Sequence, residues 1–317
     1  MELINFKNID QLLINELKVS ALICATGYES RCTHVAKSFS HLKCNKYVLA
    51  FSSFIRNTQR KANDQFFKDS NFEFIQTKED DATEIVSLIN FILANHEGNI
   101  CTIIFDYSSM TRIWYGGLLQ YLKLKEGYNK IIKILFCYSF SKYSPPQPSS
   151  NYNKYVGPIK GFFNLNIPDK PTALLLGLGY EKGRAYGLKE YLDAETYVFY
   201  TQPEKNNEQF SIDVEAYNKD IFLKLRKDHI IKYPITNLEY TINLVYTVCA
   251  DLIDDFRLIL APCGPKPFTL ACLITSIKLG NIDVWRISTG VEKAYKREAS
   301  GEISILDCSF APSHYNN

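Results

Sequence analysis

The sequence predicts an α/β protein made of two tandem Rossmann-like lobes with mostly parallel sheets, related by an internal duplication. Short apolar runs alternate with helical patterns along the 317 residues, an order typical of parallel sheets covered on both faces. The segment ALICATGYE at 21–29 also returns as ALLLGLGYE at 173–181, an offset of 152 residues (173 − 21). We therefore expect a first lobe over 1–143, a connector over 144–168, where prolines and serines cluster, and a second lobe over 169–317.

In the first lobe, apolar runs predict strands and amphipathic patterns predict helices. The helix over 81–95, for example, places Ile85, Leu88, Ile89 and Ile92 on one face. An N-terminal helix is expected within 2–18 because apolar residues recur there at roughly helical spacing. The remaining elements are strands over 19–26, 46–51, 71–76, 101–105 and 130–138, and helices over 31–42 and 114–123.

The second lobe repeats this order. TYVFYT at 196–201 matches KYVLAF at 46–51, at an offset of 150 residues (196 − 46). Residues 204–236 have no counterpart in the first lobe, and 281–287 is expected to be the last clear strand. The remaining elements are strands over 173–177 and 257–262, and helices over 182–192, 237–254 and 268–279.

Composition narrows the class of protein. A net charge of +2 does not favour duplex nucleic acid as a partner. Nine cysteines without a C-x-x-C pair are typical of buried thiols in a reducing compartment. There is no apolar run of membrane-spanning length and no signal peptide pattern, so we expect a cytoplasmic protein without membrane contact. No metal-binding histidine spacing, Walker A or G-x-G-x-x-G motif occurs, and we expect no metal and no cofactor.

The first candidate loop follows the first strand of each lobe. Glycine permits close approach of the backbone to a ligand, and the start of a helix offers free N–H groups to an anion. Glu29 and Glu181 are candidate catalytic residues, and a glutamate in this place also complements the helix dipole without any ligand. The candidate binding residues are Gly27, Tyr28, Arg31, Gly179, Tyr180 and Arg184.

The second candidate loop follows the fourth strand of the first lobe and reads DYSSMTR at 106–112. Small hydroxyl residues and a cation at a helix N-terminus suit a phosphate, and a serine N-cap with a solvated arginine is the alternative interpretation. In the second lobe the loop keeps a cation but lacks the acid and the hydroxyls. The candidate residues are Asp106 as a catalytic residue, and Ser108, Ser109, Thr111, Arg112, Gly264 and Lys266 as phosphate-binding residues.

Asp106, Ser108, Thr111 and Arg112 after a strand resemble the D-x-T-G-G-T-K-type loop of CARF domains, and two fused copies resemble the related SAVED domains. Ser109 and Met110 stand where that motif has glycines. The resemblance implies a sensor of cyclic oligonucleotides in prokaryotic antiphage defence. It further implies a pocket between the two lobes. Because no nuclease, protease or membrane segment is recognised in the sequence, we expect any effector to be a separate partner protein.

Two functions from different classes remain open. One is a nucleotide-binding sensor. Duplicated loops favour this function if the phosphate-bearing ligand is itself built of repeated units. The other is a nucleotide-directed hydrolase that cleaves a glycosidic or phosphodiester bond with Glu29, Glu181 and Asp106 as nucleophile or general base. The absence of Asp106 from the second lobe favours the hydrolase, because a single active centre needs only one such aspartate.

Overall fold

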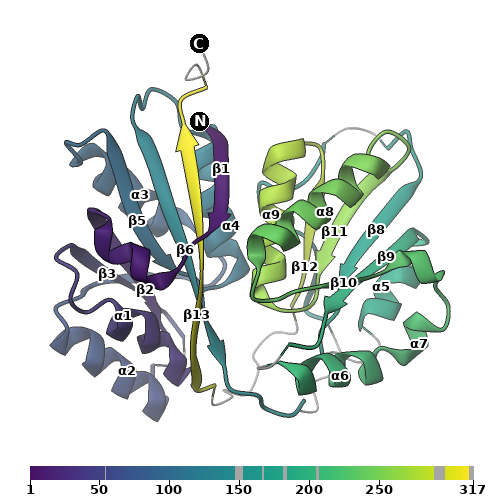
Figure 1. Cartoon of the computed structure of the whole chain (residues 1–317), viewed down its shortest axis with the longest axis horizontal. Helices are drawn as coiled ribbons and strands as arrows, with labels where there is room; N and C mark the ends of the chain where they lie inside the picture. Colours follow the sequence, from purple (N-terminus) through teal and green to yellow (C-terminus); the bar gives the residue numbers. More distant parts are fainter. Residues whose placement is uncertain are drawn as a thin grey trace. The chain divides into compact units, whose positions relative to one another are not determined.

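The computed structural model describes residues 1–53, 55–146, 153–165, 168–180, 184–204, 207–288 and 297–313. The chain forms two compact units: unit 1 contains residues 1–142 and 293–317, and unit 2 contains residues 143–292. Each unit has its own mostly parallel sheet covered by helices (Figure 1). The predicted α/β class with two such sheets is therefore confirmed.

Unit 1 is built on a seven-stranded sheet with the order β1-β13-β6-β5-β2-β3-β4. The strands from β6 to β4 in that order run parallel, and β1 and β13 run antiparallel to their neighbours. The strands are β1 (Glu2–Asn8), β2 (Val19–Thr26), β3 (Asn45–Phe51), β4 (Glu73–Thr77), β5 (Ile100–Asp106), β6 (Ile131–Ser141) and β13 (Ala299–Ala311). The helices are η1 (Gln11–Glu16), η2 (Ser30–Thr33), α1 (His34–Ser38), α2 (Thr58–Asp69), α3 (Thr83–Ala94) and α4 (Arg112–Leu124), where η denotes a 3-10 helix.

Unit 2 is built on a six-stranded sheet with the order β10-β9-β8-β11-β12-β7, in which only β7 is antiparallel. Helices α8 and α9 lie side by side on one face of it (Figure 1). The strands are β7 (Tyr155–Pro158), β8 (Thr172–Gly177), β9 (Glu195–Thr201), β10 (Ile230–Tyr233), β11 (Arg257–Pro262) and β12 (Asp283–Ser288). The helices are α5 (Arg184–Leu192), α6 (Glu208–Tyr217), α7 (Lys219–Phe222), η3 (Lys227–His229), α8 (Leu238–Leu252) and α9 (Lys266–Leu279).

The strand order reverses at the equivalent position in both sheets, next to the first parallel strand of each unit. From β2 the chain builds β3 and β4 on one side, and then crosses over to build β5 and β6 on the other. Unit 2 repeats this with β8, then β9 and β10, then β11 and β12. The reversals therefore lie between β2 and β5 and between β8 and β11. The shared order agrees with a duplication, which stays a prediction because this order is common in doubly wound sheets.

The two ends of the chain differ from the sequence-based expectation. Residues 2–18 are not a helix: Glu2–Asn8 is a strand that pairs with β13, for example Leu3 with Phe310, and a short 3-10 helix follows. Nor is 281–287 the last strand, because β13 lies between β1 and β6. Residues 293–317 thus belong to unit 1 and not to the second predicted lobe over 169–317. Pairing between segments about 300 residues apart leaves no local signal in the sequence.

The parallel strands of both units have apolar residues on both faces. In unit 1, Leu22 and Cys24 of β2 belong to a core cluster with the residues of η2, α1 and α2. All nine cysteines lie in described segments and are free thiols, and only Cys44 is half-buried while the other eight are buried. Within the described segments, no helix combines the length and the hydropathy that a membrane span requires.

Candidate functional site

The reversal of strand order in unit 1 brings the two predicted loops together. Residues 27–31 follow β2 and residues 107–111 follow β5, and both loops lie at the carboxyl edge of the sheet. The Ser109 hydroxyl donates to the Glu29 carboxylate at 3.4 Å, and the Arg31 guanidinium donates to the Ser108 carbonyl at 3.1 Å. Ligands of open α/β sheets bind in the crevice at such a reversal. Unit 1 therefore carries the candidate site in the place that the fold favours.

Arg31 joins the two loops to β6. Its side chain is 1% exposed and donates to the Glu29 carboxylate at 2.8 Å, to the Tyr138 hydroxyl at 3.2 Å and to the Ser139 carbonyl at 3.0 Å. Burial works against the charged guanidinium, but Glu29 and Tyr138 outweigh it and raise the pKa of Arg31. A cation buried with this many partners acts as a structural anchor, so a phosphate would have to displace existing bonds to reach it.

Asp106 and Ser108 form a second buried contact at the end of β5. Asp106 accepts from the Ser108 backbone N–H at 3.0 Å and from the Ser108 hydroxyl at 2.5 Å. The Ser108 hydroxyl oxygen in turn accepts from the Ser139 N–H at 2.7 Å. Asp106 and Ser108 are each at most 1% exposed. Burial, and after it the charge of Asp106, raises the pKa of the Cys24 and Cys137 thiols, which therefore stay protonated. Asp106 braces the loop, and in this arrangement it is not accessible as a nucleophile or base.

The segment that leads into β13 accepts hydrogen bonds from two donors of the first loop. The Arg297 carbonyl accepts from the Arg31 backbone N–H and from the Ser30 hydroxyl, both at 3.1 Å. The Arg297 guanidinium also lies 3.6 Å from the Glu29 carboxylate. The expectation that the helix start after Gly27 offers free N–H groups to an anion therefore does not hold at Arg31. Glu29 is left as a 13% exposed carboxylate between two arginines.

The start of α4 is a partly accessible part of the site. Thr111 caps the helix, because its hydroxyl oxygen accepts from the Trp114 N–H at 3.3 Å, and it donates to the Glu79 carbonyl at 3.0 Å. Ser109 and Arg112 are half-buried, and Arg112 is the first residue of this 13-residue helix. A helix N-terminus next to a hydroxyl and a cation favours an anion by its dipole and its orphan N–H groups.

The corresponding loop of unit 2 is shorter and more tightly packed. The Cys263 N–H donates to the Gly177 carbonyl at 2.8 Å, which ties the end of β11 to β8. A side chain at Gly264 would place Cβ 2.3 Å from the Leu178 carbonyl oxygen, so only glycine fits. Lys266 is the first residue of α9 and half-buried, in the place that Arg112 has in unit 1.

The Gly-Tyr-Glu repeat is described only in part. Gly27 and Gly179 are buried and Tyr28 and Tyr180 half-buried, and the Tyr180 ring centroid lies 4.8 Å from that of Phe210. Glu181 and the side chain of Arg184 lie outside the described residues. The expected cleft between the lobes, and with it the shared role of the two loops, stays a prediction.

Two asparagines that no sequence motif indicated hold these loops. The Asn63 amide on α2 donates to the Gly27 carbonyl at 2.8 Å and to the Glu29 carbonyl at 3.0 Å. In unit 2 the Asn218 amide, between α6 and α7, donates to the Gly179 carbonyl at 2.9 Å. Both side chains are at most 5% exposed. The two units thus fix their first loop in the same way, through an amide from the segment that follows the second parallel strand.

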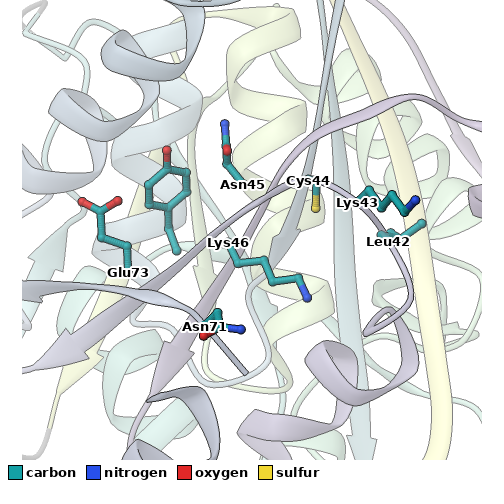
Figure 2. Close-up of a pocket in the computed structure, with 8 residues that line it drawn as sticks. Leu42, Lys43, Cys44, Asn45, Lys46, Asn71 and Glu73 are labelled. Carbon is teal, nitrogen blue, oxygen red and sulfur yellow. The ribbon is translucent and has the colours of Figure 1, made fainter. Parts of the chain in front are cut away.

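A pocket in unit 1 lies away from this site. It opens at the amino ends of β3 and β4, between residues 42–47 and residues 71 and 73 (Figure 2). The carboxyl ends of the same strands are at the opposite edge of the sheet, so no predicted site residue lines the pocket. Within the described part of the chain, no group of three or more His, Cys, Asp or Glu side chains has the arrangement of a metal site.

Fold and site together define a doubly wound α/β protein with a polar loop cluster at the strand-order reversal of unit 1. No family model and no curated protein matches the chain. Among solved structures, one similar chain is phosphoethanolamine N-methyltransferase 1 of Haemonchus contortus in complex with phosphoethanolamine and S-adenosylhomocysteine. It is 6% identical, and the match covers 94% of this chain and 90% of that chain with a TM-score of 0.22. Such a low score carries no information about function.

Proposed function

We propose that this protein is a nucleotide-binding sensor that recognises a phosphate-bearing ligand at the carboxyl edge of the unit 1 sheet. The observation that carries the proposal is the junction of the two loops at the strand-order reversal, where Ser109 contacts Glu29 and α4 begins with Arg112. The phosphate would lie at Ser109, Arg112 and the N-terminus of α4. Lys266, at the start of α9, offers a second phosphate position in unit 2.

Binding is favoured over hydrolysis because the candidate catalytic carboxylates of unit 1 are mostly buried and already have hydrogen-bond or ion-pair partners. Asp106 already accepts two hydrogen bonds from Ser108 and is 1% exposed. Glu29 is 13% exposed and already forms ion pairs with Arg31 and Arg297. For this reason we assign Glu29, Arg31, Asp106 and Ser108 to shaping the loops. Tyr28, which is half-buried beside this cluster, is the side chain we assign to stacking on a base.

The resemblance of residues 106–112 to the CARF loop supports a cyclic oligonucleotide as the ligand and prokaryotic defence as the setting. Arg112 begins α4 in unit 1, and Lys266 begins the equivalent helix α9 in unit 2. Two such cations suit a ligand that has more than one phosphate. Under this proposal the bound ligand would be reported to a separate effector protein.

The test is a thermal-shift screen of linear and cyclic nucleotides, run together with an assay for product formation. A ligand at a free concentration 100 times its Kd stabilises the folded state by about 2.7 kcal/mol. Arg112→Gln removes a charge-assisted hydrogen bond worth about 1.5–3 kcal/mol, so we expect affinity to fall about 10- to 150-fold.

Lys123→Gln is the matched control, since it removes a cation from the last turn of the same helix. We expect it to leave affinity unchanged. Equal binding by the Arg112→Gln variant would refute the site. Turnover that disappears in Glu29→Gln would instead identify a hydrolase.

A further inference from the structure

The pocket at the amino edge of the unit 1 sheet has the size of a second ligand site. Its volume is about 440 Å³, within the range of about 300–1,000 Å³ found for small-molecule sites. The lining is mostly polar and comes from the turn before β3 and the turn between α2 and β4. The lining residues are Leu42, Lys43, Cys44, Asn45, Lys46, Tyr47, Asn71 and Glu73.

Two lysines give the pocket an excess of positive charge over its single carboxylate. Lys46 is held in place, because its ammonium group donates to the Ser40 carbonyl at 3.3 Å and lies 5.9 Å from the centre of the Phe72 ring. Lys43 is exposed and free to turn toward a bound anion. The Asn71 amide lies beside Lys46, whereas Asn45, the residue before Lys46 in β3, projects to the other side of the strand (Figure 2).

The other end of the pocket offers acceptors. Glu73 is exposed, and in the view of Figure 2 it lies at the opposite end of the group from Lys43 and Leu42. Burial and then the charge of Glu73 raise the pKa of Tyr47, so its hydroxyl stays protonated beside that carboxylate. A carboxylate and a phenol suit the hydroxyl groups of a ligand, and the small apolar share of the lining disfavours a flat hydrophobic one.

We propose that this pocket binds a phosphorylated sugar, with the phosphate on Lys43 and Lys46 and the sugar hydroxyls on Glu73, Tyr47 and Asn71. The site is independent of the proposed nucleotide site, because it lies at the opposite edge of the sheet. A variant of one site therefore leaves the other unchanged.

Cys44 supplies a native probe of occupancy. It lines the pocket and is the only one of the nine cysteines that is not buried. Burial raises the pKa of its thiol, so alkylation by iodoacetamide is best followed at alkaline pH, where the thiolate fraction is larger. Peptide mass spectrometry then measures the modification rate of Cys44 alone.

Ribose 5-phosphate is expected to slow the alkylation of Cys44 in a saturable way, whereas neutral ribose at the same concentration and ionic strength is not. Lys46→Gln is expected to raise the ribose 5-phosphate concentration needed for half-maximal protection by at least about tenfold. Lys61→Gln is the control, because Lys61 is exposed on α2 and does not line the pocket.

The proposal is overturned if ribose 5-phosphate gives no protection, or if protection survives in the Lys43→Gln/Lys46→Gln double variant. Equal protection by orthophosphate would also overturn it, since the sugar would then contribute nothing. Arg112→Gln is expected to keep full protection of Cys44, which separates the outcome at this pocket from that of the nucleotide site.

Discussion

Replacing Arg31 by leucine tests whether the buried guanidinium holds the carboxyl edge of unit 1 together. The substitution removes the charge and leaves the buried carbonyls of Ser108 and Ser139 without their donor, while Glu29 loses its closer cation. Removing one partner of a buried ion pair costs about 3–5 kcal/mol, because the remaining polar groups stay desolvated. For a unit of about 170 residues, this lowers Tm by about 6 to 20 °C.

The two tryptophans allow the unfolding of unit 1 to be followed separately. Trp114 is fully buried in α4 of unit 1, and Trp285 belongs to β12 of unit 2. In a Trp285→Phe background, urea unfolding monitored by fluorescence reports on unit 1 only. Lys142→Gln is the control, since its ion pair with Glu298 is more than 60% exposed on both sides and such pairs contribute little.

A double-mutant cycle with Glu29→Gln separates the ion pair from the carbonyl contacts, and we expect a coupling energy of at least about 1 kcal/mol between Glu29 and Arg31. A loss of stability below about 1 kcal/mol in Arg31→Leu would refute the assignment of Arg31 as a structural anchor. It would also return Arg31 to the candidate ligand-binding residues.

Two further outcomes follow from local contacts. Gly264→Ala is expected to destabilise unit 2 by about 1–3 kcal/mol, because its Cβ would lie 2.3 Å from the Leu178 carbonyl oxygen. Gly187→Ala, in an open position on α5, is expected to stabilise unit 2 by about 0.5–1 kcal/mol. Urea unfolding followed by circular dichroism compares the two variants, and equal effects would contradict the packing argument. Burial raises the pKa of Glu79, but hydrogen bonds, chiefly from Ser53, outweigh it and lower the pKa, so its contribution to stability is present above the unfolded-state pKa and lost as pH falls through the folded-state pKa. The stability difference between wild type and Glu79→Gln, measured from pH 7 to pH 3, is expected to vanish at the acid end, and a difference that does not depend on pH would count against the assignment.

Local patterns predicted the central elements of both sheets. The strand over Val19–Thr26 was predicted with its observed bounds, and the helix over 81–95 corresponds to Thr83–Ala94. Apolar runs and amphipathic stripes succeed there because each element buries a surface that its own sequence encodes. The expected start of a helix after Asp106 is likewise confirmed by α4, which Thr111 caps.

The sequence predicted where the candidate loops lie, but it did not predict the contacts that their residues make. Placing loops at the carboxyl ends of β2 and β5 requires only the alternation of strands and helices. The burial of Arg31, however, depends on Tyr138 and Ser139, more than 100 residues away along the chain. No spacing within the first loop could distinguish an arginine that binds a ligand from one that anchors the sheet.

The sequence by itself determined the α/β class, the parallel strands and the edge of the sheet where the polar loops lie, because these depend on local periodicity and on the direction of the chain. Only the tertiary structure decided that β13 completes the first sheet, that the segment at Arg297 covers the first loop, and that Asn63 and Asn218 hold the glycine turns. These contacts join distant segments, and they supply buried polar groups with hydrogen-bond partners that the sequence does not place beside them.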